Sequence, residues 1–220
     1  MRNLILGAIA ALTVAGPAHA VTFSSAGAVA TPGGLKDPGL AANETVLADF
    51  DSAAHSGVTV TVTGPAGFYT GSYSGLAAAP VGDTSKYLAL GNGGMATVMF
   101  NSLKVNSLSV YLGSIDSYNT LEVLNRAGDV IKTWTGNDQP PHNGDQFASA
   151  TNRRLFINFD KADDVGALRF RSSGVAFEFD TIGGAVAGVP EPASWVLMIG
   201  GFGLVGGAMR RRQRATVRFA

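Results

Sequence analysis

Apolar and polar residues alternate along most of the chain between residues 45 and 186. In the stretch 58–63, valine and threonine alternate strictly, so the three valines would share one face of an extended segment. The same period of two recurs in 108–112, 155–159, 168–171 and 175–180. This is the period of half-buried strands, whereas an amphipathic helix would show a period of 3.6 residues. The pattern therefore predicts many short strands.

The clearest predicted hairpin spans residues 122–134. Its two alternating stretches are separated by the turn sequence Arg126-Ala-Gly128, where the glycine supplies a positive φ. No stretch between residue 21 and the C-terminal apolar run has a helical period. We therefore expect an all-β fold, a single antiparallel β-sandwich of jelly-roll-like arrangement over residues 45–186. The preceding segment, 21–44, is small and polar with several Pro-Gly turns, and is expected to be irregular with at most one strand.

The first twenty residues have the three parts of a secretory signal peptide. Arg2 gives a positive start, residues 4–14 are apolar, and Ala18 and Ala20 form a small-x-small cleavage site. Residues 1–20 are therefore predicted to be removed by signal peptidase after passage through the secretion machinery.

The C-terminal end has a second apolar run, residues 193–209, which we predict to be a transmembrane helix. Seventeen residues make a helix of roughly 25 Å, at the short end of what crosses an apolar bilayer core of about 30 Å. The basic segment that follows, 210–220, is expected to stay cytoplasmic. This orientation places everything before the linker 187–192 outside, as the signal peptide also requires.

Composition narrows the function of the exported part. Six of the 16 basic residues but only one of the 16 acidic residues lie in the terminal segments, which leaves a net charge of about −5 between them. Binding to nucleic acid is not expected, because it requires basic groups that neutralise phosphates. The chain has no cysteine, which excludes disulfides, thiol catalysis and cysteine metal sites.

Few residues offer catalytic chemistry. His55 and His142 are the histidines outside the signal peptide, and the serines in Gly71-Ser72-Tyr73-Ser74-Gly75 are misplaced for a nucleophile elbow. We predict no catalytic residue, no enzyme activity and no cofactor. The alternative is a glycan-active enzyme that uses carboxylates.

Two further sets of residues are candidates for binding. Asp49, Asp51 and Asp180 would offer oxygen ligands to a structural calcium if the first and last strands pair; otherwise they are solvent-facing carboxylates. Tyr111, on the polar face of its strand, and Tyr118, near a turn, are candidates for stacking on a sugar. The alternative is that these aromatics fill the core or pair across strands.

The C-terminal segment resembles the PEP-CTERM sorting tails of Gram-negative bacteria, of the type with a Trp three residues after the second Pro. The residues that carry the resemblance are, in order, Pro190, Glu191, Pro192, Trp195, Arg210, Arg211 and Arg212. The family's usual Ala after the Trp is Val196 here. The resemblance implies recognition by an exosortase, which would cut near Pro-Glu-Pro and transfer the exported domain to the cell surface or the exopolysaccharide matrix. A simple membrane anchor is the alternative.

These observations predict an exported surface or matrix protein with a non-enzymatic, structural or adhesive β-sandwich. The second interpretation is a carbohydrate-binding module for exopolysaccharide. The predicted partners are the exosortase, the secretion machinery, the membrane and, for the second interpretation, exopolysaccharide.

Overall fold

The structure, a computed structural model, describes residues 21–52, 55–187 and 192–212. The chain divides into two units, the first ending at Val186 and the second beginning at Ala187. The predicted signal peptide, with Ala18 and Ala20, lies outside the described residues.

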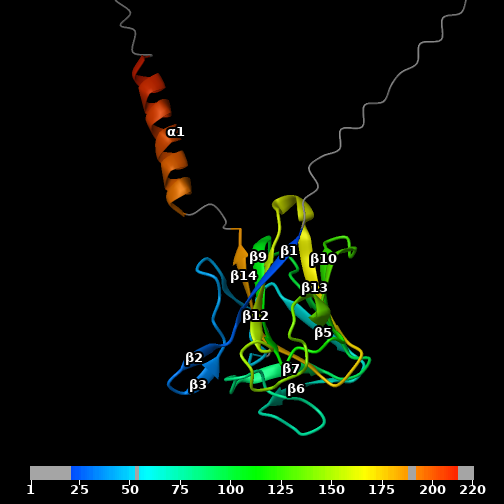
Figure 1. The fold of residues 1–220 in the computed structure, drawn as a ribbon. Coiled ribbons are helices and arrows are strands. Elements are labelled where there is room, and N and C mark those ends of the chain that lie inside the picture. Colours follow the sequence, from blue (N-terminus) through cyan, green and yellow to red (C-terminus); the bar gives the residue numbers. More distant parts are fainter. Residues whose placement is uncertain (1–20, 53–54, 188–191, 213–220) are drawn as a thin grey trace, which may run out of the picture. The chain divides into compact units, whose positions relative to one another are not determined.

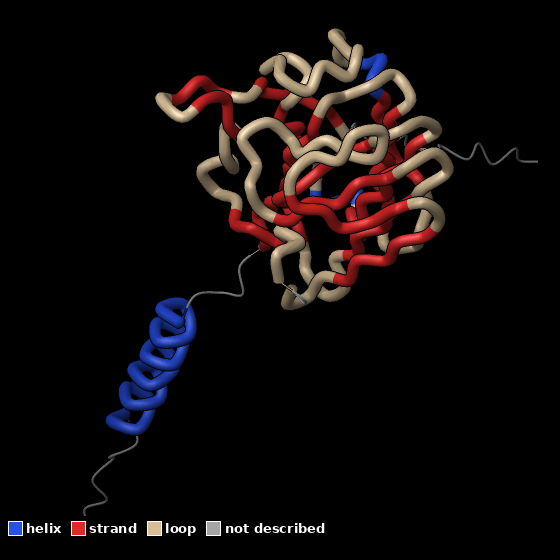
Figure 2. Tube along the Cα trace, turned by 90° about the horizontal axis from the view of Figure 1, so that it is seen from below, coloured by secondary structure: helices blue, strands red, loops and turns tan. Residues whose placement is uncertain are grey.

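Two large antiparallel sheets make up most of the first unit (Figures 1 and 2). The larger sheet contains, in spatial order, β1 (Thr22–Gly27), β12 (Arg153–Asn158), β9 (Val105–Gly113), β14 (Phe177–Val186), β7 (Lys86–Leu90) and β6 (Ala66–Thr70), with β4 (Thr45–Ala48) also paired to β14. The second sheet contains β11 (Val130–Thr135), β10 (Asn119–Asn125), β13 (Val165–Ser172), β8 (Met95–Met99) and β5 (Thr59–Thr63). The prediction of an all-β sandwich is confirmed, while its jelly-roll arrangement stays a prediction.

The remaining elements are short, apart from one helix. They are the hairpin of β2 (Val29–Thr31) and β3 (Gly34–Lys36), the 3-10 turns η1 (Gly136–Asp138) and η2 (Lys161–Asp163), and the helix α1 (Pro192–Arg212) of the second unit.

One apolar core lies between the two sheets. Leu108, Val110 and Leu112 of β9 face it from the larger sheet, and Leu168 and Phe170 of β13 face it from the second. The alternating pattern correctly placed these residues inside. Val58, Val60 and Val62 also pack against the core, while the threonines between and after them are exposed.

The contact between the sheets is made in part by two stacked rings. Phe170 of β13 and Phe179 of β14 have ring centroids 3.8 Å apart and planes inclined by 11°. Both side chains are fully buried. Because the residues belong to different sheets, this pair helps to join the two layers.

The predicted hairpin is confirmed as β10 and β11, which pair with Val123 opposite Lys132. Gly128 in its turn has a φ of +93°, a left-handed conformation that costs a glycine little and other residues more.

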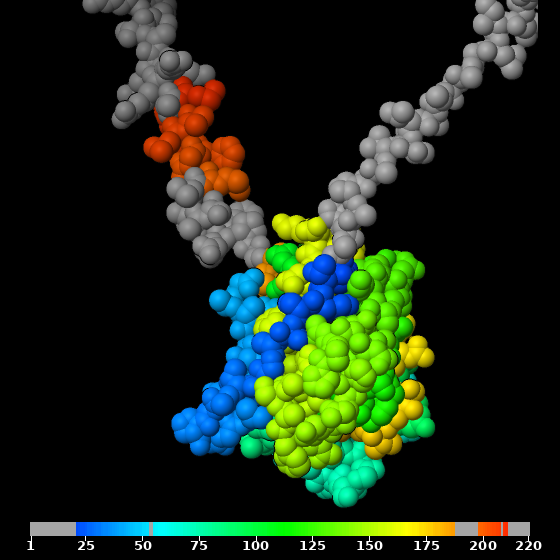
Figure 3. All heavy atoms as spheres, viewed as in Figure 1, coloured from blue at the N-terminus to red at the C-terminus, as the bar shows by residue number. Residues whose placement is uncertain are grey.

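The prediction for residues 21–44 was wrong. The segment contains three strands, and β1 extends the edge of the larger sheet, where Phe23 lies opposite Ile157. Figure 3 shows this segment in blue on the surface of the domain. None of its short, polar strands has a strong alternating pattern. β1 pairs with the largely buried strand β12, whereas β2 and β3 pair with each other. The pairing is therefore supplied by tertiary context.

Replacement of Phe170 by Ala should lower the free energy of unfolding by about 3–5 kcal/mol, because it removes a buried ring at the contact between the sheets. The measurement is urea unfolding of the full chain in mild detergent. Phe147→Ala is the matched control, because Phe147 is 81% exposed. Its effect should stay within about 0.5 kcal/mol. Equal effects of the two substitutions would contradict the assignment of Phe170 to the core.

Candidate functional site

The second unit contains the segment that was predicted to span the membrane. The helix α1 begins at Pro192, the last residue of Pro-Glu-Pro, and ends at Arg212, the last arginine of the first basic cluster. Proline is favoured in a first helical turn, where its missing N–H has no partner to lose. Among the side chains of α1 that the structure describes, the exposed large apolar ones are Met198, Ile199, Phe202, Leu204, Val205 and Met209.

In the parts of the chain that the structure describes, no helix combines the length and apolar character needed to cross a membrane. The predicted span over 193–209 is therefore not confirmed. Pro190 and Glu191 of the sorting motif lie outside the described residues.

Tyr111 does not lie where the sugar-binding prediction placed it. Its side chain is 2% exposed, and its hydroxyl donates to the carbonyl of Val81 at 2.8 Å. Burial, followed by the nearby charges of Asp37 and Asp83, raises the pKa of Tyr111. The polar face of β9 is covered by other parts of the chain, so Tyr111 cannot present a ring to a sugar.

Tyr118 is partly exposed and lines a hollow of about 520 Å³. Its hydroxyl lies 2.6 Å from both Asp116 Oδ2 and the carbonyl oxygen of Val175, which holds the ring in one orientation. The other side chains of the hollow include Thr63, Asn92, Met95, Thr120 and Arg171. An oriented aromatic ring beside amide, hydroxyl and guanidinium groups is a suitable lining for a polar ligand.

The three candidate calcium ligands do not come together as predicted. β4 does pair with β14, but at Ala48 opposite Ile182. Asp49 accepts the backbone N–H groups of Asp51 and Ser52, and Asp51 accepts the N–H of Lys86. Among the described residues no group of three or more acidic, His or Cys side chains could hold a metal ion. Asp180 instead belongs to a buried polar network.

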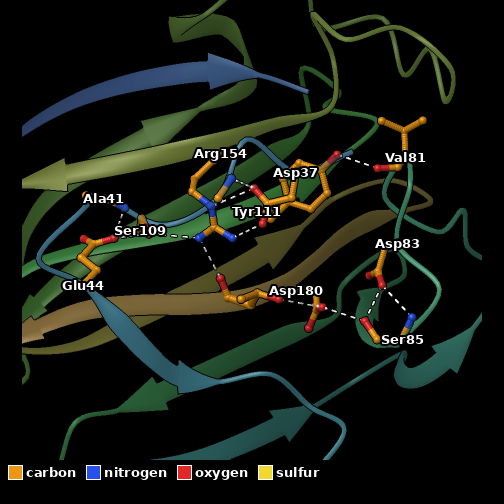
Figure 4. Close-up of polar contacts among 12 residues, drawn as sticks. Asp37, Ala41, Glu44, Val81, Asp83, Ser85, Ser109, Tyr111, Arg154 and Asp180 are labelled. Atoms are coloured by element: carbon orange, nitrogen blue, oxygen red, sulfur yellow. Dashed lines mark hydrogen bonds and ion pairs between the residues drawn. The ribbon is translucent and has the colours of Figure 1, made fainter. Parts of the chain in front are cut away.

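Arg154 of β12 is at the centre of that network (Figure 4). Its side chain is fully buried, and its guanidinium forms a two-point ion pair with Asp37, in which Nε donates to Oδ1 at 2.9 Å and the terminal NH2 group donates to Oδ2. The other terminal nitrogen donates at 3.0 Å to Ser109 Oγ and to the carbonyl of Thr181. A buried guanidinium is tolerated only when its donors are matched in this way.

Glu44 extends the network on the same face of the larger sheet. Its carboxylate accepts from Ser107 and Ser109 of β9 at 2.9 and 2.6 Å, and from the backbone N–H of Ala41. Asp37 and Glu44 both come from the segment that was expected to be irregular. The segment 35–44 therefore crosses the outer face of the larger sheet and is held there by charge.

Close packing accompanies these polar contacts. Gly183 of β14 lies beneath Leu40, and a Cβ added to Gly183 would come within 2.3 Å of the Leu40 side chain. A larger residue at this position would require the Leu40 side chain to move.

Asp180 of β14 lies beyond Arg154, next to the loop that follows Pro80. Ser85 Oγ is within hydrogen-bond distance of Asp83 Oδ1 and 3.2 Å from Asp180 Oδ2, so the hydroxyl bridges the two carboxylates (Figure 4). Burial, and then the charge of Asp83, raise the pKa of Asp180 to about 7.

Glu178 is a second buried carboxylate on β14, and its two oxygens both have partners. Oε1 accepts the N–H of Ala78 at 2.8 Å, and Oε2 accepts the hydroxyl of Ser114 at 3.1 Å. Burial raises the pKa of Glu178 to about 7 in spite of these bonds.

The histidines do not form a nucleophile-and-base pair in the described part of the chain. His55 Nε2 lies 3.4 Å from Asp49 Oδ1, and no described serine hydroxyl bonds to either histidine. A hydrolase of the serine type requires such a bond.

Two further aromatic side chains, Phe68 and Tyr73, are exposed but do not belong to the sugar-binding residues predicted from the sequence. Phe68 of β6 is exposed and borders a hollow of about 460 Å³ with Asp51 and Lys86, and Tyr73 is exposed in the turn that follows β6. The glycines at 67, 71 and 75 next to these residues are the sequence signal for exposure, and the structure places β6 at the edge of the larger sheet.

Comparison with known proteins decides the identity of the C-terminal segment. Residues 188–213 match the family described as the PEP-CTERM protein-sorting motif. The chain carries a PEP-CTERM sorting signal. This confirms the resemblance drawn from Pro-Glu-Pro, Trp195 and the arginine cluster, and it indicates a surface protein sorted by an exosortase.

Comparisons outside the PEP-CTERM signal say less. No curated protein matches the chain. A solved structure, the family 11 carbohydrate-binding module of the cellulosomal cellulase Lic26A-Cel5E of Clostridium thermocellum, is similar over 67% of this chain and 97% of its own, with 15% identity and a TM-score of 0.26. A similarity of this size carries no argument about a ligand.

Replacement of Arg154 by Met should lower the free energy of unfolding by about 3 kcal/mol, because Asp37 would lose its buried countercharge and Ser109 and Thr181 a shared donor. Chemical unfolding measures the change. Arg171→Met is the control: Arg171 is largely exposed and 3.9 Å from Glu122, so its loss should cost less than about 1 kcal/mol. A small effect at Arg154 would show that the covering segment does not depend on this pair.

Proposed function

We propose that this chain is an exported surface or extracellular-matrix protein whose β-sandwich has a non-enzymatic, structural or adhesive role. The PEP-CTERM motif at residues 188–213 is the observation that carries the proposal. An exosortase recognises the tail, cuts at or near Pro-Glu-Pro, and releases the domain to the cell surface or the exopolysaccharide matrix. Secretion machinery and signal peptidase act first, at residues 1–20.

The division of the chain supports this role for the tail. The last strand, β14, ends at Val186, and the second unit begins at Ala187, so the motif follows the folded domain in the sequence. Cleavage at the motif would leave every strand of the sandwich intact. Proline restricts the residue before it, so Val189 and Glu191 are expected to present an extended segment to the enzyme.

In cells that contain the exosortase, Glu191→Ala should leave the protein full-length, because the enzyme would lose the central residue of its recognition sequence. Mass spectrometry of the surface fraction should find a C-terminus near Val189 to Pro192 in the wild type and the intact arginine-rich tail in the variant. Glu178→Gln is the control, because Glu178 lies on β14 and should leave processing unchanged. An intact tail on wild-type surface protein would contradict processing and leave only an anchor.

The hollow at Tyr118 favours a second candidate function, binding of the exopolysaccharide. The ring of Tyr118 is held by two contacts of its hydroxyl, and Asn92, Thr120 and Arg171 border the same hollow. Aromatic faces stack on the apolar faces of sugars, and the polar groups would bond to sugar hydroxyls.

If the hollow binds sugar, Tyr118→Ala should weaken binding to the producer's polysaccharide about tenfold, through loss of a stacking contact worth about 1.4 kcal/mol. A glycan array or calorimetry measures the affinity. Tyr118→Phe is the control, since it keeps the ring and removes only the hydroxyl. Tyr111→Ala is a second control, because Tyr111 is buried and cannot present its ring to a sugar. No affinity for any polysaccharide would exclude this function, and hydrolysis of one would overturn the non-enzymatic assignment.

A further inference from the structure

Asp83 and Asp180 are two carboxylates that meet around one serine. Asp83 belongs to the loop between Pro80 and Ser85, and Asp180 belongs to β14, at the outer face of the larger sheet (Figure 4). Ser85 Oγ contacts an oxygen of each. The loop and the sheet therefore bring two negative charges to one place.

The hydrogen-bond donors at this place all reach the same oxygen of each carboxylate. Asp83 Oδ1 accepts the backbone N–H of Ser85 at 2.8 Å, and Asp180 Oδ2 accepts the hydroxyl of Thr181 at 2.9 Å. The hydroxyl of Ser85 has one hydrogen and can satisfy only one of the two carboxylates at a time.

The second oxygen of each carboxylate has no partner. Asp83 Oδ2 and Asp180 Oδ1 are both buried and unbonded among the described residues, and Asp180 as a whole is only 3% exposed. A buried carboxylate oxygen without a partner costs a large desolvation free energy, so such a group normally acquires a cation or a proton.

The other carboxylates of the network have partners for both of their oxygens. Both oxygens of Asp37 bond to Arg154, and both oxygens of Glu44 and of Glu178 accept hydrogen bonds. Arg154 is already engaged by Asp37, and no described lysine or arginine forms an ion pair with Asp83 or Asp180. Among the described carboxylates of the network, unbonded oxygens are therefore confined to Asp83 and Asp180.

We propose that Asp83 and Asp180 bind one calcium ion through Asp83 Oδ2 and Asp180 Oδ1, beside Ser85 Oγ. Only oxygen donors are present, which suits a hard cation and disfavours zinc. With so few protein ligands, the affinity should be that of extracellular modules, about 10⁻⁴–10⁻³ M. The ion would attach the 80–85 loop to β14. This site differs from the one predicted from the sequence. Asp180 belongs to both, and Asp83 takes the place of Asp49 and Asp51.

A bound proton is the competing explanation, because the pKa of Asp180 is raised to about 7. A proton held at a raised pKa stabilises the folded state at low pH and is lost as the pH rises through 7. A calcium ion has the opposite signature, because it binds the ionised carboxylates and its effect grows as they ionise.

The test is thermal unfolding of the full chain in mild detergent at pH 7.5, first with chelator and then with 10 mM calcium chloride. Calcium should raise the wild-type melting temperature by roughly 3–10 °C. Asp180→Asn and Asp83→Asn should each abolish the rise. Two variants are used because Asp180 is buried, whereas Asp83 is half-buried in a loop, where a substitution is better tolerated.

Glu178→Gln is the matched control, since Glu178 is an equally buried carboxylate on the same strand whose oxygens are both bonded. It should keep the full calcium response. Absence of a rise in the wild type, or an equal rise in all variants, would overturn the proposal. A wild-type melting temperature that falls from pH 6 to 8 in calcium, and falls less in Asp180→Asn, would assign the pair to a proton instead. Glu178, whose pKa is also raised to about 7, accounts for the fall that remains in the variant. An equal response to magnesium would overturn the choice of calcium.

Discussion

The ion pair between Arg154 and Asp37 is the interaction on which the arrangement of the domain depends. A guanidinium without solvent exposure requires a partner for its charge and acceptors for its donors, and Asp37, Ser109 and Thr181 supply them. Because Asp37 comes from the N-terminal segment, the pair also determines where that segment lies. The same segment then crosses β12, β9 and β14. This crossing brings Glu44 to Ser109 and places Leu40 over Gly183.

The two sheets consequently differ in their outer faces. The face of the larger sheet that carries Ser109, Tyr111, Arg154 and Asp180 is buried beneath the 35–44 segment and the 80–85 loop. On the second sheet, the threonines of β5 and Arg171 of β13 remain exposed. Surface for contact with a polysaccharide or another protein is therefore more available on the second sheet, which also contributes to the Tyr118 hollow.

The sorting function and the sandwich are separable in the chain. The PEP-CTERM motif follows the last strand, and its recognition depends on a few residues in sequence order. The activity of the domain depends on surfaces assembled from several strands. The sorting signal can therefore be recognised from a short stretch of sequence, whereas a binding surface requires the folded domain.

The sequence alone determined the features that depend on local pattern. A period of two placed Leu108, Val110 and Phe170 in the core, a glycine between two alternating stretches predicted the β10–β11 hairpin, and Pro-Glu-Pro with Trp195 and the arginines identified the sorting signal. Each is a short-range property, and side chains that alternate along a strand must face opposite sides of a sheet.

Only the tertiary structure decided what covers the polar face of each strand. The sequence of a strand does not show whether its polar face meets water or a charged segment of the chain. For this reason the sequence predicts an exposed Tyr111 and an irregular segment 21–44, and the structure shows a buried tyrosine and three strands. Chain order likewise does not show which loop reaches β14. The sequence predicts Asp49 and Asp51 beside Asp180, and the structure brings Asp83 there instead. Burial of charge is a property of the whole fold, because each group must find its partner from a distant part of the chain.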